Sequence, residues 1–399
     1  MNDEADFVLG LKYLLTSQLE ECEAHFEMGV QDKTNSHRRV RSSFGHALVA
    51  VVRALISFED EDEAVAQNRL VATQKLAQAS LSANSSGSGW GIFSSSANKA
   101  DAKEVREQLL SNLDLELLSA DAGLFIAMIQ FTQESAMGIM RGALTLRKSF
   151  KTYQKASREL RELHTEGKQT SRSRRSSSDF AVSLLAERRR RDAYRGPSTQ
   201  LIVVDNEMYF DAPCELDESF YGNIAIGSTD DGFGPLVVRG ATIEDRVRAS
   251  SKMGTGLFHL VFSLIPPRFS SVIGSAMGFE TVPDRRKGLS CLRFCVDQGT
   301  SRSPLAALAL LAFHSAMLIL ARGVSDDADM KEATEVLEAC LRQYPDSPLF
   351  RFFEGRLQRG RGRLSHAADA FEVAQKCTRN IHQLAYLCIC EFALVFKCS

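Results

Sequence analysis

Apolar side chains recur at three- and four-residue steps along most of the chain, the spacing that places them on one face of an α-helix. Residues 6–31 carry such a series, with a candidate break at Thr16 and Ser17. The same pattern predicts further helices over these ranges: 41–58, 61–81, 101–133, 135–164, 242–265, 269–278, 285–298 and 305–321. The apolar positions of 101–133 become nearly continuous, which predicts a helix buried on both sides. We therefore expect an all-α protein.

Residues 321–379 contain an internal repeat, because positions 34 apart match in kind. The matched pairs are Ala321 with Gly355, Ala333 with Ala367, Leu337 with Phe371, and Cys340 with Ala374. The small pairs would let helices approach closely, while the large pair would fill the space between them. Pro345, and later Gly360 with Gly362, would end or break helices and so produce helical hairpins. A 34-residue period of hairpins is typical of tetratricopeptide repeats, which stack into a solenoid.

The helix expected at residues 382–397 has the place of the first helix of a third repeat, whose second helix is missing. Without a capping helix, an apolar terminal helix would expose a hydrophobic patch. Two explanations remain open. Either the chain is a truncated product or gene model, or this helix packs on another chain.

Composition narrows the classes of function and the compartment. The formal net charge of −2 gives no overall reason to expect binding to nucleic acid or to a membrane. The most apolar run, 305–321, has 17 residues, whereas a transmembrane helix needs about 20 apolar residues. The nine cysteines are scattered and no apolar signal precedes them, so we expect a reduced intracellular compartment. We predict a cytoplasmic protein without a transmembrane segment, with the nucleus and lipid droplets as alternative locations.

Residues 166–240 differ from the helical regions on either side. Residues 166–200 have nine Lys/Arg against four acidic residues, and 199–238 have eight Asp/Glu and no Lys/Arg. Adjacent blocks of opposite charge attract each other, which favours a collapsed, disordered insertion over a folded domain. The expected organisation is an N-terminal helical repeat region (1–165), this insertion, and a C-terminal region with tetratricopeptide-like repeats (241–399).

Two features of the insertion leave functional alternatives open. The run Arg188–Arg191 is either a solvated part of a linker or a site for anionic lipid or RNA. Ser177 follows Arg174 and Arg175, so it is a candidate phosphorylation site for a basophilic kinase.

The sequence contains no recognisable arrangement of catalytic or cofactor-binding residues. Residues 222–234 are rich in glycine but lack the Lys-Ser/Thr of a phosphate-binding loop. Cys291 with Cys295, and Cys388 with Cys390, lack partners at zinc-site spacing, so we expect buried small residues. The histidines have no linked carboxylate and nucleophile. We therefore predict no enzymatic activity, no metal and no cofactor.

The remaining candidate site is the concave face that the first helices of such repeats line. Position nine of the repeat points into this face, and it is Arg322 in one unit and Arg356 in the next. The candidate partner-binding residues are Arg322, Leu349, Phe352, Phe353, Arg356, Arg359 and Tyr386. Paired arginines beside aromatic rings suit a protein partner with an acidic and apolar segment. The alternative is that the arginines only solvate an exposed helix face.

Four segments of the chain, taken in order, carry a resemblance to a known family. They are FGHALVAVVRALISFEDEDE (44–63), GALTLRKSFKTY (142–153), GTGLFHLVFSLIPP (254–267) with Gly278-Phe279, and SPLFRFFEGRLQRGRG (347–362). They resemble the tetratricopeptide repeat protein 39 family, which includes the fungal inclusion body clearance protein, over residues 1–165 and 241–399. The resemblance implies an all-helical repeat scaffold without catalytic residues. It also implies a link to protein-inclusion clearance at lipid droplets, as in fungi, or to lipid homeostasis or cilia, as in animals.

Two functions therefore compete. The first is a non-catalytic protein–protein interaction scaffold linked to lipid homeostasis or to inclusion clearance at lipid droplets. The alternative is a lipid-binding or membrane-surface protein that holds an apolar molecule between helices, or touches droplets through 257–265 or the terminal helix. We favour the scaffold because the sequence contains a clear repeat and no recognisable set of catalytic groups.

Overall fold

The structure is a computed structural model, and it describes residues 3–87, 99–133, 135–170, 241–264, 284–320, 327–378 and 382–397. Every regular element within these ranges is an α-helix, which confirms the predicted all-α fold. The helices are α1 (Asp3–Leu15), α2 (Leu19–Gln31), α3 (Ser36–Ser57), α4 (Asp60–Gly87), α5 (Lys99–Thr132), α6 (Ala136–Thr170), α8 (Ile243–Leu264), α10 (Arg285–Asp297), α11 (Ser303–Leu320), α12 (Asp327–Gln343), α13 (Pro348–Gly360), α14 (Leu364–Cys377) and α15 (His382–Lys397). The helix predicted at 269–278 and the insertion from residue 171 onward lie outside the described residues.

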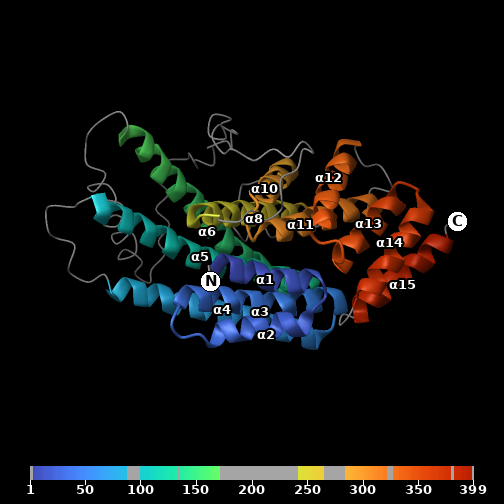
Figure 1. The fold of residues 1–399 in the computed structure, drawn as a ribbon, viewed down its shortest axis with the longest axis horizontal. Coiled ribbons are helices and arrows are strands. Elements are labelled where there is room, and N and C mark those ends of the chain that lie inside the picture. The colour runs from blue at the N-terminus through green and yellow to red at the C-terminus, as the bar shows by residue number, and fades with distance from the viewer. Residues whose placement is uncertain are drawn as a thin grey trace.

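The helices form a stack of antiparallel hairpins (Figure 1). Each helix contacts the next one along the chain, and a second set of contacts joins α1, α3, α5, α8, α11 and α13 in that order. Contacts of comparable extent do not join α2, α4, α6, α10, α12 and α14 to one another in the described part of the chain. The helices that contact one another, α1 to α13, therefore form an inner row, and the helices that lack such contacts form an outer row, as in a curved solenoid. We refer to α1, α3, α5, α8, α11, α13 and α15 as the inner row.

Local sequence explains where the hairpins turn. The break predicted at Thr16 and Ser17 is confirmed, because α1 ends at Leu15 and Ser17 has a left-handed φ of 60°. At the start of α13, the Ser347 hydroxyl accepts a hydrogen bond from the Phe350 N–H, and Pro348 follows the cap. The serine hydroxyl bonds to one of the N–H groups that a helix start leaves without a partner, and the proline has no N–H to satisfy.

The 34-residue repeat corresponds to stacked hairpins, as predicted. Ala333, Ala367, Cys340 and Ala374 are all fully buried, and α11, α12 and α13 contact one another. A Cβ atom on Gly355 of α13 would lie 2.5 Å from Cε1 of Phe371 of α14, so glycine is what lets α13 and α14 meet. Ala321, the partner of Gly355 in the repeat, lies outside the described residues.

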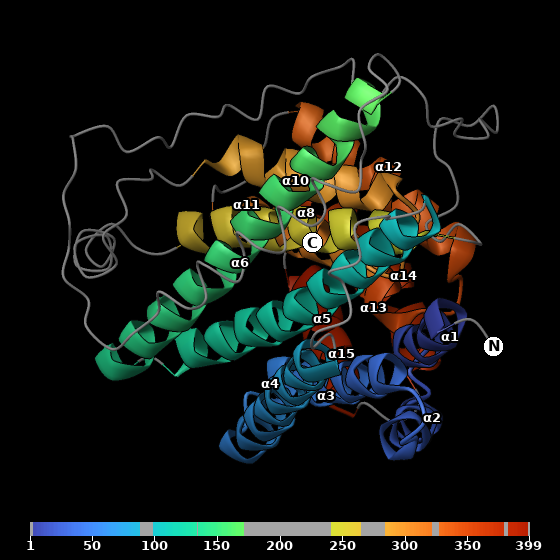
Figure 2. The same cartoon turned by 90° about the vertical axis from the view of Figure 1, so that its left-hand side faces the viewer.

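Helix α5 is the centre of the N-terminal half, and it lies between α4 and α6 in Figure 2. It contacts α3, α4, α6 and α8, which explains its nearly continuous apolar pattern. One apolar cluster contains Leu124 and Phe150 together with Leu310 and Phe350. The two helical regions therefore share a core, and the division at residue 241 stays a prediction.

Two described helices have the length and apolar composition to cross a membrane: α3, and residues 103–132 of α5. Most of their apolar windows, 67% and 61%, is buried inside the protein. Core helices of water-soluble proteins have the same properties, so these helices are weak evidence for a membrane span.

Candidate interaction site

Charged side chains line the buried side of the inner row, where a solenoid would present its concave face. We call this cluster the ionic axis, and it consists of Glu4, Arg41, Asp114, Asp121, Arg246 and Arg302. Arg41 Nη1 lies 2.7 Å from Glu4 Oε2, and Arg41 Nη2 bonds to Asp114. Helices α1, α3 and α5 are joined by this one guanidinium.

Asp121 of α5 is the most enclosed member of the ionic axis. Arg302 Nη2 lies 2.8 Å from its Oδ2. Tyr153 and Ser250 donate hydroxyl hydrogen bonds of 2.9 Å to its two oxygens. The Arg302 guanidinium also lies over the Phe44 ring, 5.0 Å from the ring centroid. Asp121 therefore joins α5, α6, α8 and the start of α11.

Burial and pairing act on these carboxylates in opposite directions. Burial raises the pKa of Asp121 above its ordinary value, although Arg302 and the two hydroxyl groups oppose the shift. Burial also acts to raise the pKa of Asp114, but Arg41, Arg246 and Arg302 together outweigh it and hold the pKa below its ordinary value. Three guanidiniums balance three carboxylates, so the ionic axis is internally neutralised.

Sequence reasoning did not find the ionic axis. Its bonded partners are far apart along the chain, by 37 positions for Arg41 with Glu4 and 73 for Arg41 with Asp114. The available signal was weak: a charged residue stands inside an apolar stretch of a helix, as Asp121 does in the second half of α5. Such residues in core helices are expected to be paired.

The structure brings three of the predicted concave-face residues together at the C-terminal end of the solenoid. We call Phe352, Arg356 and Arg359 of α13 the arginine face. Arg356 Nη1 lies 3.2 Å from Glu391 Oε1, and Arg359 bonds to the other carboxylate oxygen of Glu391. The Arg356 guanidinium also lies over the Phe352 ring, 5.6 Å from the centroid.

The terminal helix α15 therefore supplies a carboxylate to the arginines. Burial lowers the pKa of Arg356, and Arg359 acts in the same direction, while Glu391 opposes them. The buried Nε of Arg356 has no hydrogen-bond acceptor among the described residues. Sequence reasoning missed Glu391, although it is the one acidic residue in 382–397.

The other predicted site residues lie in different surroundings. Leu349 and Phe353 are half-buried and pack against the central apolar cluster. Tyr386 is 67% exposed. Arg322, Ser177 and the run Arg188–Arg191 lie outside the described residues, so their predicted roles stay predictions.

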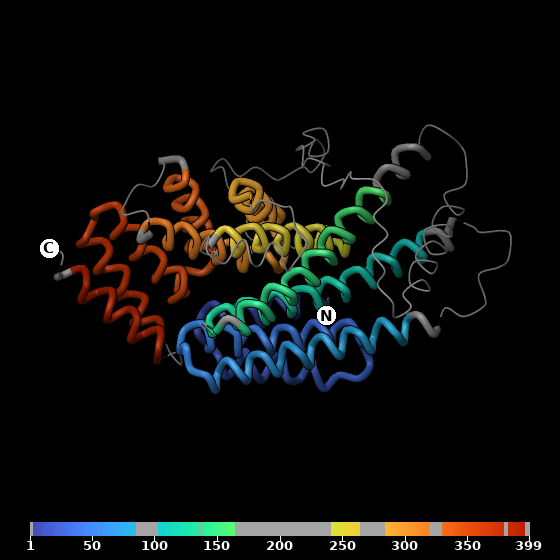
Figure 3. The backbone as a smooth tube through the Cα atoms, turned by 180° about the vertical axis from the view of Figure 1, so that it is seen from behind, coloured from blue at the N-terminus to red at the C-terminus, as the bar shows by residue number. Residues whose placement is uncertain are grey.

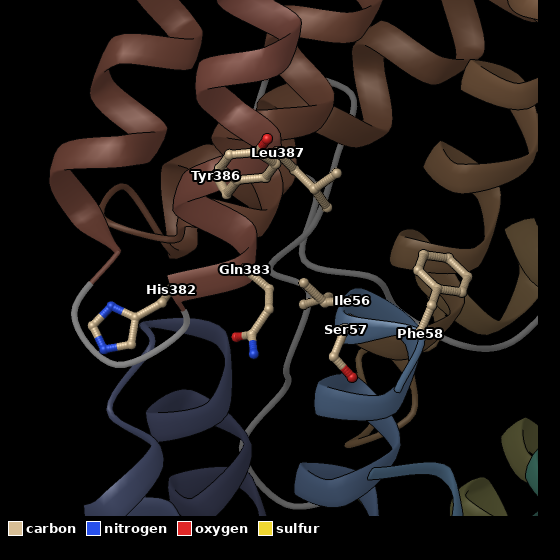
Figure 4. A pocket seen from close by; sticks show the side chains of 7 residues that line it. All are labelled: Ile56, Ser57, Phe58, His382, Gln383, Tyr386 and Leu387. Carbon is tan, nitrogen blue, oxygen red and sulfur yellow. The ribbon is translucent and has the colours of Figure 1, made fainter. Parts of the chain in front are cut away.

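A cleft of about 520 Å³ opens where α3 ends and α15 begins. From α3 and its C-cap it is lined by Ile56, Ser57 and Phe58. From α15 it is lined by His382, Gln383, Tyr386 and Leu387. Figure 4 shows His382 at one end of this group and Phe58 at the other. We call this hollow the α3–α15 cleft.

The cleft arises because the solenoid curves until its last inner helix reaches its second. Helices α3 and α15 are in direct contact, and Figures 1 and 3 show the start of α15 close to the end of α3 from opposite directions. Leu384 and Cys388 of α15 are buried in the same apolar cluster as α1 to α5. Helix α15 is thus held on its inward side, although Tyr386, Ile389 and Leu394 are exposed on its outward side.

The described part of the chain offers little for metal binding or nucleophilic chemistry. No group of three or more His, Cys, Asp or Glu side chains there could hold a metal ion. Cys291, Cys295 and Cys388 are buried, and Cys390 is half-buried. Burial raises the pKa of the Cys388 thiol to about 12, which opposes formation of the reactive thiolate.

Comparison with known proteins agrees with this architecture. No solved structure matches the chain. A family model described as Iml2/Tetratricopeptide repeat protein 39 matches residues 8–399, which is nearly the whole sequence. Together with the stacked hairpins and the resemblance of the four segments, this match shows that the chain belongs to the Iml2/Tetratricopeptide repeat protein 39 family.

Proposed function

We propose that this protein is a non-catalytic scaffold that binds other proteins through the C-terminal end of its solenoid, and that the arginine face takes an acidic and apolar segment. Family membership supports a protein-interaction role of the tetratricopeptide type. The link to inclusion clearance or lipid homeostasis comes from the family resemblance alone. We place the protein in the cytoplasm, on the basis of its scattered cysteines.

The contact between α15 and α13 carries the proposal. Helix α15 is apolar apart from a few side chains, and its Glu391 accepts bonds from Arg356 and Arg359. The chain's own helix α15 thus shows that an apolar segment with one carboxylate fits the arginine face. Arginine forks bind carboxylates with well-defined geometry, so an acidic and apolar segment of a partner would bind by competing with Glu391.

Affinity purification of the full chain, with quantitative comparison of variants, tests this proposal. Glu391→Gln should raise the yield of specific partners, because it removes the internal competitor. Arg356→Gln with Arg359→Gln should lower that yield by about tenfold. The matched control is Arg342→Gln with Arg363→Gln, two exposed arginines away from this face. Identical partner lists for all four proteins would contradict the proposal.

A lipid-droplet surface role is the second candidate function. The segment 257–265 was one predicted contact, but Leu257, Phe258, Leu260 and Phe262 are buried. The terminal helix α15 is a better candidate for contact with a droplet surface than 257–265, because Ile389 is 46% and Leu394 is 47% exposed. Purified chain should then float with phospholipid-coated oil droplets, and Ile389→Glu with Leu394→Glu should prevent it. Flotation that is absent, or unaffected by these changes, would remove this candidate.

A further inference from the structure

The α3–α15 cleft presents two large aromatic side chains to solvent. Phe58 is 66% exposed and Tyr386 is 67% exposed, and both line the same hollow. Single exposed aromatics are ordinary on protein surfaces, but an exposed apolar hollow between two helices is typical of binding sites. Helix α15 is fixed in place beside the cleft, since Leu384 and Cys388 on its inward side are buried.

Phe58 has an unusual backbone conformation for its side chain. It is the C-cap of α3, with φ 55° and ψ 29°, and its N–H donates to the Ala54 carbonyl. Glycine or asparagine is the usual choice in this left-handed position, because a bulky side chain there is strained. Burial does not compensate for the strain, because most of the ring is exposed. A strained and exposed aromatic residue is a reason to look for a binding role.

The rim of the cleft beside Phe58 is acidic. Glu59, Asp60 and Glu61 follow directly as α4 begins, and all three are exposed. Among the residues that the structure describes, none forms an ion pair with these three carboxylates. The start of α4 accounts for part of this charge, because a helix N-terminus favours carboxylates. The field at this rim nevertheless attracts cations, in contrast to the arginine face.

We propose that the α3–α15 cleft binds a segment of a partner protein that carries an aromatic or aliphatic anchor beside lysine or arginine. The anchor would pack between Phe58 and Tyr386, and its basic neighbours would lie against Glu59, Asp60 and Glu61. This surface goes beyond the arginine face, since it takes a ligand of opposite charge. Leu387 lines the cleft and Glu391 contacts the arginines one helical turn away, so a scaffold could hold two different segments at once.

Selection of random dodecapeptides displayed on phage against the full chain tests this proposal. Enriched peptides should combine a Phe, Trp, Leu or Met with at least one Lys or Arg. Fluorescence anisotropy with an enriched synthetic peptide then measures affinity. Glu59→Lys with Glu61→Lys should weaken binding by about tenfold or more, and so should Tyr386→Ser. Added salt should weaken binding as well.

Two further variants distinguish an effect on binding from an effect on folding or on the total charge. Glu104→Lys with Glu338→Lys makes the same charge change on exposed parts of α5 and α12, and should bind as the parent does. Phe58→Asn should lose binding while the thermal midpoint is kept or raised, because asparagine tolerates the left-handed conformation. A loss of binding in Phe58→Asn therefore cannot be attributed to unfolding.

Three outcomes would overturn the proposal: no basic peptide with an apolar anchor is enriched, such a peptide binds Tyr386→Ser as tightly as the parent, or the two double charge reversals bind equally. Arg356→Gln with Arg359→Gln should leave binding of the basic peptide unchanged. Failure of the arginine face and failure of the cleft can therefore be distinguished.

Discussion

The ionic axis and the arginine face place the same chemical groups in two different settings. In the ionic axis, Arg302 and Asp121 are buried, and the carboxylate is 0% exposed. In the arginine face, the side chains of Arg356 and Arg359 are 19% and 23% exposed, and Glu391 is 12% exposed. The inner row thus carries guanidinium–carboxylate pairs both in its buried interior and at the C-terminal end of the solenoid.

The difference shows that burial, rather than residue type, separates a structural pair from an accessible one. A buried charge that loses its partner is left without water, so its pair is needed for folding. A pair that reaches solvent can exchange its partner for water or for another carboxylate at low cost. The first part of the solenoid has therefore closed its concave face on itself, while the last part keeps a usable surface.

Removing one charge from the ionic axis should have the largest effect. Arg302→Met leaves the Asp121 carboxylate buried and unpaired, and should lower the free energy of unfolding by about 3–5 kcal/mol. Denaturant titration followed by circular dichroism measures this change. Adding Asp121→Asn to Arg302→Met should restore part of the stability, because the orphaned charge is gone. Equal losses for Arg302→Met and Arg359→Gln would refute the contrast between the two regions.

Acid should lower the stability of the protein through four buried or half-buried histidines of the inner row. Burial lowers the pKa of His37, His46, His259 and His314, which lie on α3, α8 and α11. The pKa of His259 falls from 6.5 to about 4, so the unfolded chain binds the proton at a higher pH than the folded chain. Stability is therefore full above the unfolded pKa and is lost as the pH falls towards the folded pKa.

Denaturant titrations should show a loss of about 2–3 kcal/mol between about pH 7 and about pH 4.5 from His259 alone. His259→Gln keeps a side-chain acceptor for the Asp284 N–H, which bonds to His259 Nδ1 at 3.3 Å. This variant should show a shallower dependence on pH. A curve that is as steep as that of the parent would contradict the assignment.

Adding one methyl group beside the ionic axis and one beside the arginine face compares the packing of the two regions. A Cβ on Gly254 would lie 2.0 Å from Tyr153 Cζ, and one on Gly355 would lie 2.5 Å from Phe371 Cε1. Both alanine variants should lose about 1–3 kcal/mol in thermal or denaturant unfolding. Gly254→Ala should lose more, because the Tyr153 ring is also held by its hydrogen bond to Asp121. In a Tyr153→Phe background that extra loss should disappear, and its persistence would count against this explanation.

The smallest effect is expected at the arginine face. Arg359→Gln should change the free energy of unfolding by less than about 1 kcal/mol, because its pair with Glu391 is partly exposed. The same variant should still alter partner binding, so stability and interaction are expected to separate here. Thermal unfolding beside the affinity purification described above measures both.

Much of the fold could be predicted from periodicity alone. The apolar spacing located the break at Ser17, the buried α5 and the hairpins of the 34-residue repeat, because these features depend on neighbours three, four or 34 positions away. The candidate site was predicted less fully. Phe352, Arg356 and Arg359 lie together in the structure, while their partner-binding role stays a prediction, and Glu391 and Phe58 were not predicted. Their roles depend on contacts between helices that no local pattern encodes.

By itself, the sequence determined that this chain is an all-α stack of hairpins, because amphipathic spacing and close-packed small residues are local properties. Only the tertiary structure decided which charges are neutralised and which surfaces stay open. Glu4 accepts a hydrogen bond from the Ser301 N–H, 297 positions away, and α15 reaches back to α3. The curvature of the whole solenoid decides which distant residues come into contact, since the curvature is the sum of small rotations over every repeat. For that reason the ionic axis and the α3–α15 cleft exist only in the folded molecule.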